Sequence, residues 1–224
     1  MEEKIQVLEA TIHNDSAKGA MSKMVDYLQQ DTFHVVEVVT MHSLVRLLEK
    51  EEHRQYLEEF DFTFAGDKEV LEAGGVTDSK RLQEAEDMLF VKMFLHYLHK
   101  NHKKVFLLVD DADVLQKVTS FMKEDYRDIR IIESALVEEQ GLSEEMIINQ
   151  INGAETDCVM AFMESPLQEE FLIRNRLLIN TKVWIGLGRE LHERMNENTW
   201  LFRLKKFLST RFWKKKIEKE QKKM

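Results

Sequence analysis

The sequence is poor in the residues that break or cross-link a chain. Its 224 residues include 8 Gly, one Pro and one Cys. Average usage would give about 16 Gly and about 11 Pro, which excludes a collagen-like or low-complexity chain and an all-β protein with frequent turns. A single Cys excludes a disulfide framework and a cysteine-based zinc site. Cys158 lies in the apolar run CVMAFM, so it is expected to be buried in a protein of the reducing cytosol.

Long apolar runs are also missing. No run approaches the ~20 residues that span a bilayer, and the first residues, MEEKIQ, are too acidic for a signal peptide. With 43% hydrophobic residues the chain can still bury a core, and its length fits about one domain. We therefore expect a cytoplasmic protein.

Charge is distributed unevenly along the chain. The net charge is −9, yet residues 201–224 hold ten basic and two acidic residues, so the first 200 residues carry −17. The acidic part would repel phosphates, and no nucleic-acid partner is expected. The composition changes near Asn198, which predicts one domain over 1–198 and a basic appendage over 199–224.

The appendage has the pattern of a basic amphipathic C-terminal helix. Its apolar stripe is formed by Leu201, Leu204, Leu208 and Phe212. Its candidate membrane-binding residues are Trp200, Arg203, Lys206, Arg211, Trp213 and Lys214. Interfacial helices combine an apolar stripe, Trp and cations in this way, so the pattern predicts binding to an anionic membrane surface. The alternative is that the stripe packs against the domain and the lysines are solvated.

Apolar strand-like runs alternate with helical segments over the rest of the chain. Strands are predicted at 5–12, 34–39, 61–64, 105–109, 129–132, 158–162 and 183–188, a mostly helical segment at 43–60 and a long helix at 82–101. Such alternation predicts parallel strands joined by right-handed crossovers. We expect an α/β fold, a Rossmann-like open sandwich with a mainly parallel six- or seven-stranded sheet. Its ligand would bind beyond the carboxyl ends of the strands.

Several helix starts carry capping signals. Ser143 precedes two Glu and an apolar helical pattern, which is typical of an N-cap. In SPLQ, Ser165 is predicted as an N-cap, Pro166 as the first helical residue and Gln168 as the partner in a capping box.

Two other segments of the sequence suggest different chemistries. The segment VFLLVDDADV resembles the acidic start of a receiver domain, but the later strand ends in Phe162 rather than a phospho-accepting Asp. It also resembles the Asp-x-Asp of haloacid-dehalogenase phosphatases, with Asp111 as nucleophile and Asp113 as acid. The simpler interpretation is that one of these Asp residues caps the next helix. His96, His99 and His102 share one helix, but no further ligand is evident, so no metal or cofactor is expected.

Five segments carry a family resemblance. VVEVVTMHSLVRLL is similar to a strand ending in Thr-x-Asn, with Thr40 kept and His42 in the Asn place, and FDFTFAGDKEV to a strand that presents a catalytic Asp. VFLLVDDADVLQKVTSFMKEDYRDIRIIES resembles the next strand, turn and helix. ESPLQEEFLIRNR resembles a Gly-x-Pro-x-Gln-Glu motif, and VWIGLG the strand after it. Together they resemble the WecG/TagA/CpsF family of glycosyltransferases.

The resemblance implies a Rossmann-like enzyme of cell-surface polysaccharide or wall-polymer synthesis. Such enzymes transfer an N-acetylhexosamine from a UDP-sugar to a polyprenyl-diphosphate-linked acceptor at the inner face of the cell membrane, and a C-terminal appendage touches the membrane. It makes Asp67 the candidate catalytic base. The candidate substrate-binding residues are Thr40, His42, Pro166, Gln168, Glu169, Gly186 and Gly188.

This sequence also departs from the family pattern. The family Asp falls on Gly66, one place before Asp67, and an expected Arg falls on Gly75, with Arg81 nearby. Glycines of the phosphate-binding turns are replaced by Val109, Asp110, Phe162 and Glu164. Phe162 would fill the space of a diphosphate and the two acids would repel it, at about 4 kcal/mol each before screening. We therefore predict a degraded donor site.

Three functions remain open at this point. In the first, the chain is a divergent active transferase in which Asp67 deprotonates the acceptor while Thr40 and Gln168 hold the donor. In the second, it is a catalytically inactive relative that binds a second copy, an active paralogue or another protein at the membrane. The third is an α/β phosphatase that uses Asp111.

Overall fold

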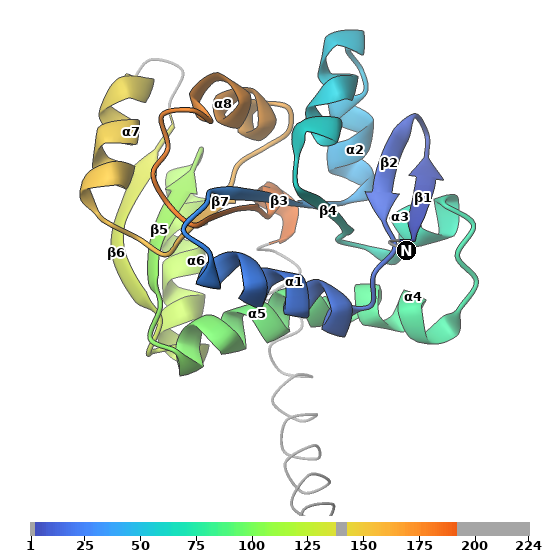
Figure 1. Cartoon of the computed structure of the whole chain (residues 1–224), viewed down its shortest axis with the longest axis horizontal. Coiled ribbons are helices and arrows are strands. Elements are labelled where there is room, and N and C mark those ends of the chain that lie inside the picture. Colours follow the sequence, from blue (N-terminus) through green and yellow to red (C-terminus); the bar gives the residue numbers. More distant parts are fainter. Residues whose placement is uncertain (1–2, 138–142, 192–224) are drawn as a thin grey trace, which may run out of the picture. The chain divides into compact units, whose positions relative to one another are not determined.

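The computed structural model describes residues 3–137 and 143–191. Over these residues the predicted α/β fold is confirmed, with helices on both faces of one sheet of eight strands (Figure 1). The order across the sheet is β1-β2-β4-β3-β8-β7-β5-β6. The strands are β1 (Lys4–Val7), β2 (Ala10–His13), β3 (His34–Val39), β4 (Phe62–Ala65), β5 (Lys104–Val109), β6 (Arg130–Leu136), β7 (Cys158–Phe162) and β8 (Val183–Gly186).

Strand pairing is parallel everywhere except between β1 and β2. The central strand β3 pairs with β4 on one side, Val39 opposite Ala65, and with β8 on the other, Glu37 opposite Gly186. Strands β7 and β8 are buried along their whole length, as continuous apolar strands of a sheet covered on both faces should be. The carboxyl ends of β2 to β8 therefore meet along one edge of the sheet.

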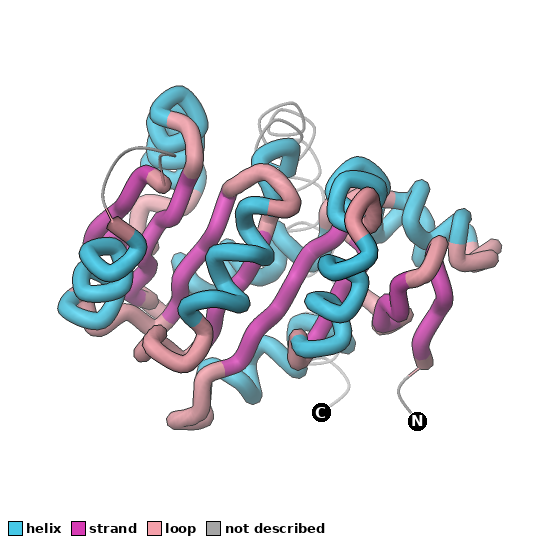
Figure 2. The backbone as a smooth tube through the Cα atoms, turned by 90° about the horizontal axis from the view of Figure 1, so that it is seen from above, coloured by secondary structure: helices cyan, strands magenta, loops and turns pink. Residues whose placement is uncertain are grey.

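Helices cover both faces of this sheet (Figures 1 and 2). In Figure 1, α1 and α5 lie below the sheet, whereas α2, α7 and α8 lie above it. The helices are α1 (Ala17–Gln29), α2 (Met41–Leu47), α3 (Lys68–Ala73), α4 (Ser79–Glu86), α5 (Leu89–Lys100), α6 (Ala112–Asp125), α7 (Glu144–Gly153) and α8 (Leu167–Asn175), with a 3-10 helix, η1 (Glu51–Glu59).

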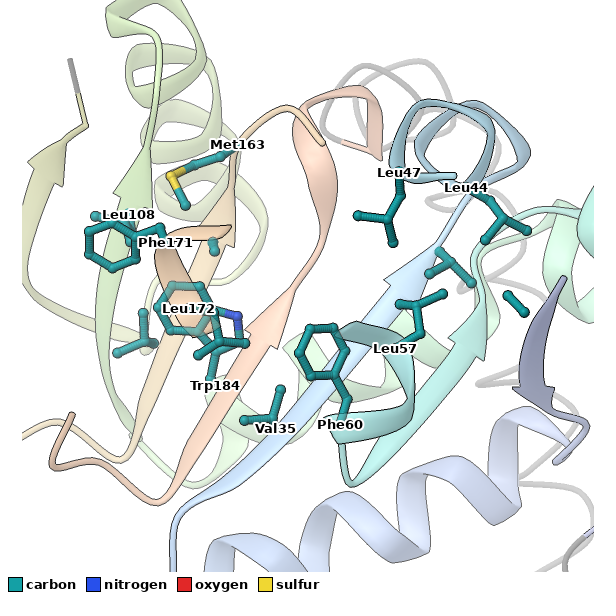
Figure 3. Close-up of a cluster of buried hydrophobic side chains, with 14 of the residues drawn as sticks. Val35, Leu44, Leu47, Leu57, Phe60, Leu108, Met163, Phe171, Leu172 and Trp184 are labelled. Carbon is teal, nitrogen blue, oxygen red and sulfur yellow. The ribbon is translucent and has the colours of Figure 1, made fainter. Parts of the chain in front are cut away.

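The core between the sheet and α8 is built on large side chains. Phe171 stacks on Trp184 with ring centroids 6.1 Å apart, and both residues are fully buried. Figure 3 shows Leu108 close to Phe171, and Leu172 between Phe171 and Trp184 in the same cluster. This packing fixes α8 on β7 and β8, and with it the segment that enters α8.

Two sequence predictions of single elements were wrong. Residues 5–12 form the hairpin of β1 and β2 rather than one strand, which brings the sheet to eight strands. In its turn Leu8 has φ 54, a conformation that leucine rarely adopts. The turn contains no Gly or Asn, so the sequence gives no signal for it. The helix predicted at 82–101 is divided into α4 and α5 by Met88 at φ 49.

Helix caps agree with the sequence prediction at two places, Ser143 and Asp111. Ser143 accepts a hydrogen bond from the N–H of Met146. Ser16, for which no cap was predicted, accepts one from the N–H of Gly19. Asp111 accepts bonds from the N–H groups of Asp113 and Val114 at the start of α6, as the simpler interpretation of this segment predicted.

The basic appendage predicted over 199–224, with all of its candidate membrane-binding residues, lies outside the described residues. Within the described ranges, none of the helices is both long and apolar enough to cross a membrane.

Candidate functional site

Most of the predicted site residues gather at the carboxyl edge of the sheet. Thr40 follows β3, Asp67 follows β4, Gly188 follows β8, and Pro166 follows β7. They are brought together because parallel strands end at the same edge, which is also where such sheets bind ligands.

A buried hydrogen-bond network centres on Gln168. Its Nε2 donates to Glu37 Oε1 at 2.5 Å, and its Oε1 accepts from the N–H groups of Met163 at 3.3 Å and Gly188 at 3.4 Å. The side chain of Gln168 thus links β3, the end of β7 and the end of β8. Gly186 is required beside it, because a Cβ there would overlap Glu37 Oε2.

Glu37 and Glu169 are a pair of buried carboxyl groups, 2% and 1% exposed. Burial raises the pKa of Glu37 well above its usual range, and the charge of Glu169 raises it further. Burial also raises the pKa of Glu169 to about 7, against the hydrogen bond that Ser165 donates to it at 2.6 Å. The second oxygen of each group is buried without a hydrogen-bond partner: Oε2 in both Glu37 and Glu169. Around neutral pH these groups hold protons more readily than ordinary carboxylates.

Ser165 does not cap α8, contrary to the sequence prediction. The N-cap position is Pro166, after a cis peptide bond, and no side chain caps the helix there. The hydroxyl of Ser165 instead donates a hydrogen bond to the carboxyl group of Glu169. Gln168 has no capping role either, because its side chain points to Glu37 in β3.

Thr40 and His42 meet at Glu190, a residue that the sequence analysis did not single out. The hydroxyl of Thr40 donates to Glu190 Oε2 at 3.1 Å and accepts the N–H of Ser43 as the cap of α2. His42 Nε2 lies 2.9 Å from Glu190 Oε1, and its side chain is 58% exposed. A carboxylate of the chain itself therefore occupies the N-terminal end of α2.

Asp67 holds two helix starts at once. Its Oδ1 accepts the N–H of Val70 at 3.0 Å as the cap of α3, and its Oδ2 accepts the N–H of Met41 at 2.8 Å in α2. The residue is 8% exposed. Position 66 leaves little room for a side chain, since a Cβ on Gly66 would lie 3.1 Å from the Val39 carbonyl oxygen.

Two arginines pair with the acids that replace glycines. Arg189 Nε and Nη2 contact the two oxygens of Asp110 at 3.1 and 2.8 Å, and Asp110 also accepts the N–H of Glu164 at 2.7 Å. The carboxylate of Glu164 lies between Arg46 Nη1, at 2.5 Å, and Arg189 Nη1, at 3.7 Å. The acids are thus largely neutralised, which the sequence analysis, counting the acids alone, did not foresee.

The remaining candidates lie nearby or on the other face. Gly188 has φ +69, with open space where a Cβ would stand. Phe162 is fully buried, and because Val159 and Ala161 face α8, it faces the opposite layer. Arg81 bonds to Glu84 at 2.9 Å and to Asn14 at 3.3 Å.

Sequence reasoning missed Glu37, Arg46, Arg189 and Glu190. Glu37 interrupts an apolar strand, and a charged residue inside such a run is a usable signal of a buried polar contact. The other three lie in helix or loop positions where charged residues are ordinary, so nothing in the sequence marks them.

Among the described residues there is no group of three or more His, Cys, Asp or Glu that could hold a metal ion. His96 and His99 have ring centroids 6.3 Å apart, and His99 Nδ1 accepts the N–H of Asp128. Asp111 acts as a helix cap, and the two backbone hydrogen bonds that it accepts lower its pKa.

Comparison with known proteins gives a family for this arrangement. The sequence model of the Glycosyl transferase WecG/TagA/CpsF family matches residues 5–192. The match covers the strands and helices described above, apart from Lys4 at the start of β1. No curated protein gives a significant match.

Proposed function

Since the chain belongs to the WecG/TagA/CpsF family of glycosyltransferases, we propose that it transfers an N-acetylhexosamine from a UDP-sugar to a polyprenyl-diphosphate-linked acceptor, with weak affinity for the donor. The observation that carries the weak affinity is the carboxylate of Glu164, held between Arg46 and Arg189 at the carboxyl edge of the sheet. A diphosphate has to displace this carboxylate before it can bind there.

The roles of the site residues follow from their positions. The acceptor hydroxyl attacks the anomeric carbon of the sugar, the bond from that carbon to the diphosphate breaks with its electrons leaving on UDP, and Asp67 takes the hydroxyl proton. Each Asp67 oxygen accepts one backbone N–H in the free protein, and an ionised carboxylate is the kind of group that takes a proton in general base catalysis. Thr40 and His42 would contact the donor once Glu190 gives way, while Gln168 keeps the loop ends in place.

The substitution Asp67→Asn tests both roles of this residue. It is expected to abolish transfer, because an amide cannot accept the proton. It is also expected to lower the free energy of unfolding by about 1–2 kcal/mol, because the amide nitrogen cannot accept one of the two N–H bonds. Transfer assays and urea denaturation measure the two effects.

Asp78 offers a matched control for this prediction. It caps α4 with Oδ1 alone, which accepts the N–H groups of Lys80 and Arg81. An asparagine can present the same oxygen, so Asp78→Asn should leave both stability and transfer nearly unchanged. An Asp67→Asn variant with full activity would remove Asp67 as the base.

The second candidate function is binding without catalysis, with the chain acting as an inactive relative of the family's enzymes. It is favoured by the engagement of both Asp67 oxygens in helix capping and by the carboxylates of Glu164 and Glu190 at the donor edge. In that role the chain would bind a second copy or an active paralogue in the same polymer synthesis. An assay of UDP release from UDP-N-acetylhexosamine, with acceptor-loaded vesicles, separates the two: slow turnover at millimolar donor supports transfer, and none supports the second role.

We also propose that the basic residues of 200–224 bring the protein to the inner face of the cell membrane. Roughly 1 kcal/mol per basic residue is available near an anionic surface, and the acidic remainder of the chain would turn away from it. Truncation before Trp200 should leave a folded protein that no longer sediments with phosphatidylglycerol vesicles. Binding of the full chain should weaken from 0.1 M to 1 M salt, as the Debye length falls from ~10 to ~3 Å. Equal sedimentation of both proteins would contradict the proposal.

A further inference from the structure

We propose that Arg46 and Arg189 form a diphosphate-binding site of this chain, and that the carboxylate of Glu164 occupies the site when no ligand is bound. The inference rests on the proposed function only for the identity of the ligand. The site itself is inferred from the contacts of these three side chains and of Asp110.

The three residues come from neighbouring strands at the carboxyl edge. Arg46 lies in α2, which follows β3, while Arg189 follows β8 and Glu164 follows β7, and these strands are adjacent in the order β3-β8-β7. The two guanidinium groups contact the same carboxylate, Arg46 at Oε1 and Arg189 at Oε2. A carboxylate held between two guanidinium groups marks a position where an external anion would also be held.

Asp110 fixes the direction of Arg189. Its side chain is only 3% exposed and takes both Nε and Nη2 of the guanidinium. The hydrogen bond that Arg189 donates to Asp110 raises the pKa of Arg189, so this arginine keeps its positive charge. Arg189 Nη1 lies 3.7 Å from Glu164 Oε2, which is longer than a hydrogen bond. Asp110 is therefore a positioning residue for the proposed site.

Glu164 can be displaced because its ion pairs are open to water. The side chains of Arg46, Glu164 and Arg189 are 42%, 33% and 36% exposed. Ion pairs in such surroundings stabilise by only about 0–1 kcal/mol. A diphosphate carries more charge than a carboxylate and offers oxygens for bidentate contacts to both guanidinium groups. Glu164 would thus lower the affinity for a diphosphate without closing the site.

The test is calorimetric titration of the full chain with inorganic pyrophosphate at fixed pH and low salt. Glu164→Gln removes the competing charge, yet the backbone N–H that Glu164 donates to Asp110 remains. This variant is expected to bind pyrophosphate at least ~10-fold more tightly than the unaltered chain, because the ligand no longer has to displace a carboxylate or meet its repulsive charge.

Two further variants make the result specific. Glu133→Gln removes one exposed acid from β6, at the far edge of the sheet, and should bind pyrophosphate like the unaltered chain. Adding Arg46→Gln to Glu164→Gln should cancel the gain. Thermal unfolding of each variant checks that it is folded. The proposal is overturned if folded Glu164→Gln binds no better than Glu133→Gln, or if the double variant keeps the gain.

The same titrations distinguish the source of the diphosphate. UDP-N-acetylglucosamine represents the donor, geranyl diphosphate represents the lipid acceptor, and UMP lacks a diphosphate. The site is expected to follow the ligands that carry a diphosphate, so Glu164→Gln should improve the binding of at least one of the first two and leave UMP unchanged. A gain for pyrophosphate together with absence of transfer in any assay would support the site and contradict the proposed enzyme activity.

Discussion

Replacing Gly186 with alanine is expected to lower the free energy of unfolding by roughly 2–6 kcal/mol. The added Cβ would overlap Glu37 Oε2 and crowd Gln168 Nε2. Overpacking of a buried site costs about 1–3 kcal/mol, and separating Gln168 from Glu37 leaves buried polar groups unpaired at about 1–3 kcal/mol more. Urea denaturation of the purified variant measures the loss.

Gly153 provides the control for this substitution. It closes α7, and no atom lies within 4 Å of the place where its Cβ would stand. Alanine there should stabilise the protein slightly, by about 0.5–1 kcal/mol, because a helix favours alanine over glycine. If both variants changed stability equally, the close packing of Gly186 against Glu37 would be refuted.

Stability is expected to fall as the pH rises from about 4.5 through about 7. The folded state keeps protons on Glu37 and Glu169 that the unfolded chain has already released, because burial raises both pKa values, that of Glu169 from 4.5 to about 7. A group whose pKa is raised in the folded state stabilises the fold fully when the pH is below its unfolded pKa. This stabilisation is lost as the pH rises through its folded pKa. The pKa shift of Glu169 alone corresponds to a loss of roughly 3 kcal/mol in the free energy of unfolding.

The substitution Glu37→Gln isolates this effect. The amide keeps an oxygen for the bond from Gln168 and cannot ionise. The variant should be more stable than the unaltered chain by about 1 kcal/mol or more at pH 8, with little difference near pH 4.5. Glu133→Gln, at an exposed position of β6, should follow the unaltered curve. Superimposable pH profiles for Glu37→Gln and the unaltered chain would show that Glu37 does not titrate in this way.

The sequence predicts the layers of this fold well, because continuous apolar strands such as β5 and β7 have a clear signal. Both wrong element predictions lie at non-glycine residues that adopt a left-handed conformation. Leu8 turns one predicted strand into the hairpin of β1 and β2, and Met88 divides one predicted helix into two. Neither residue type favours that conformation, so tertiary packing decides it.

The sequence predicts which edge of the sheet the candidate site residues occupy, but it does not predict which side chains they contact. The motif residues Thr40, Asp67 and Gln168 lie at the expected edge, since the strands before them end there. Their partners depend on side chains from other strands and loops, such as Glu37 for Gln168 and Glu190 for Thr40. Pairings over more than a hundred residues leave no local pattern in a single sequence.

Calorimetric titration of the full chain with a UDP-N-acetylhexosamine tests the central claim, that an ion-paired carboxylate of the chain weakens the donor site. We predict a dissociation constant above ~10 μM, equivalent to binding weaker than about −7 kcal/mol, because Glu164 holds Arg46 and Arg189 in the free protein. A dissociation constant well below ~10 μM would contradict the account, since it would mean that the donor binds tightly without having to displace Glu164.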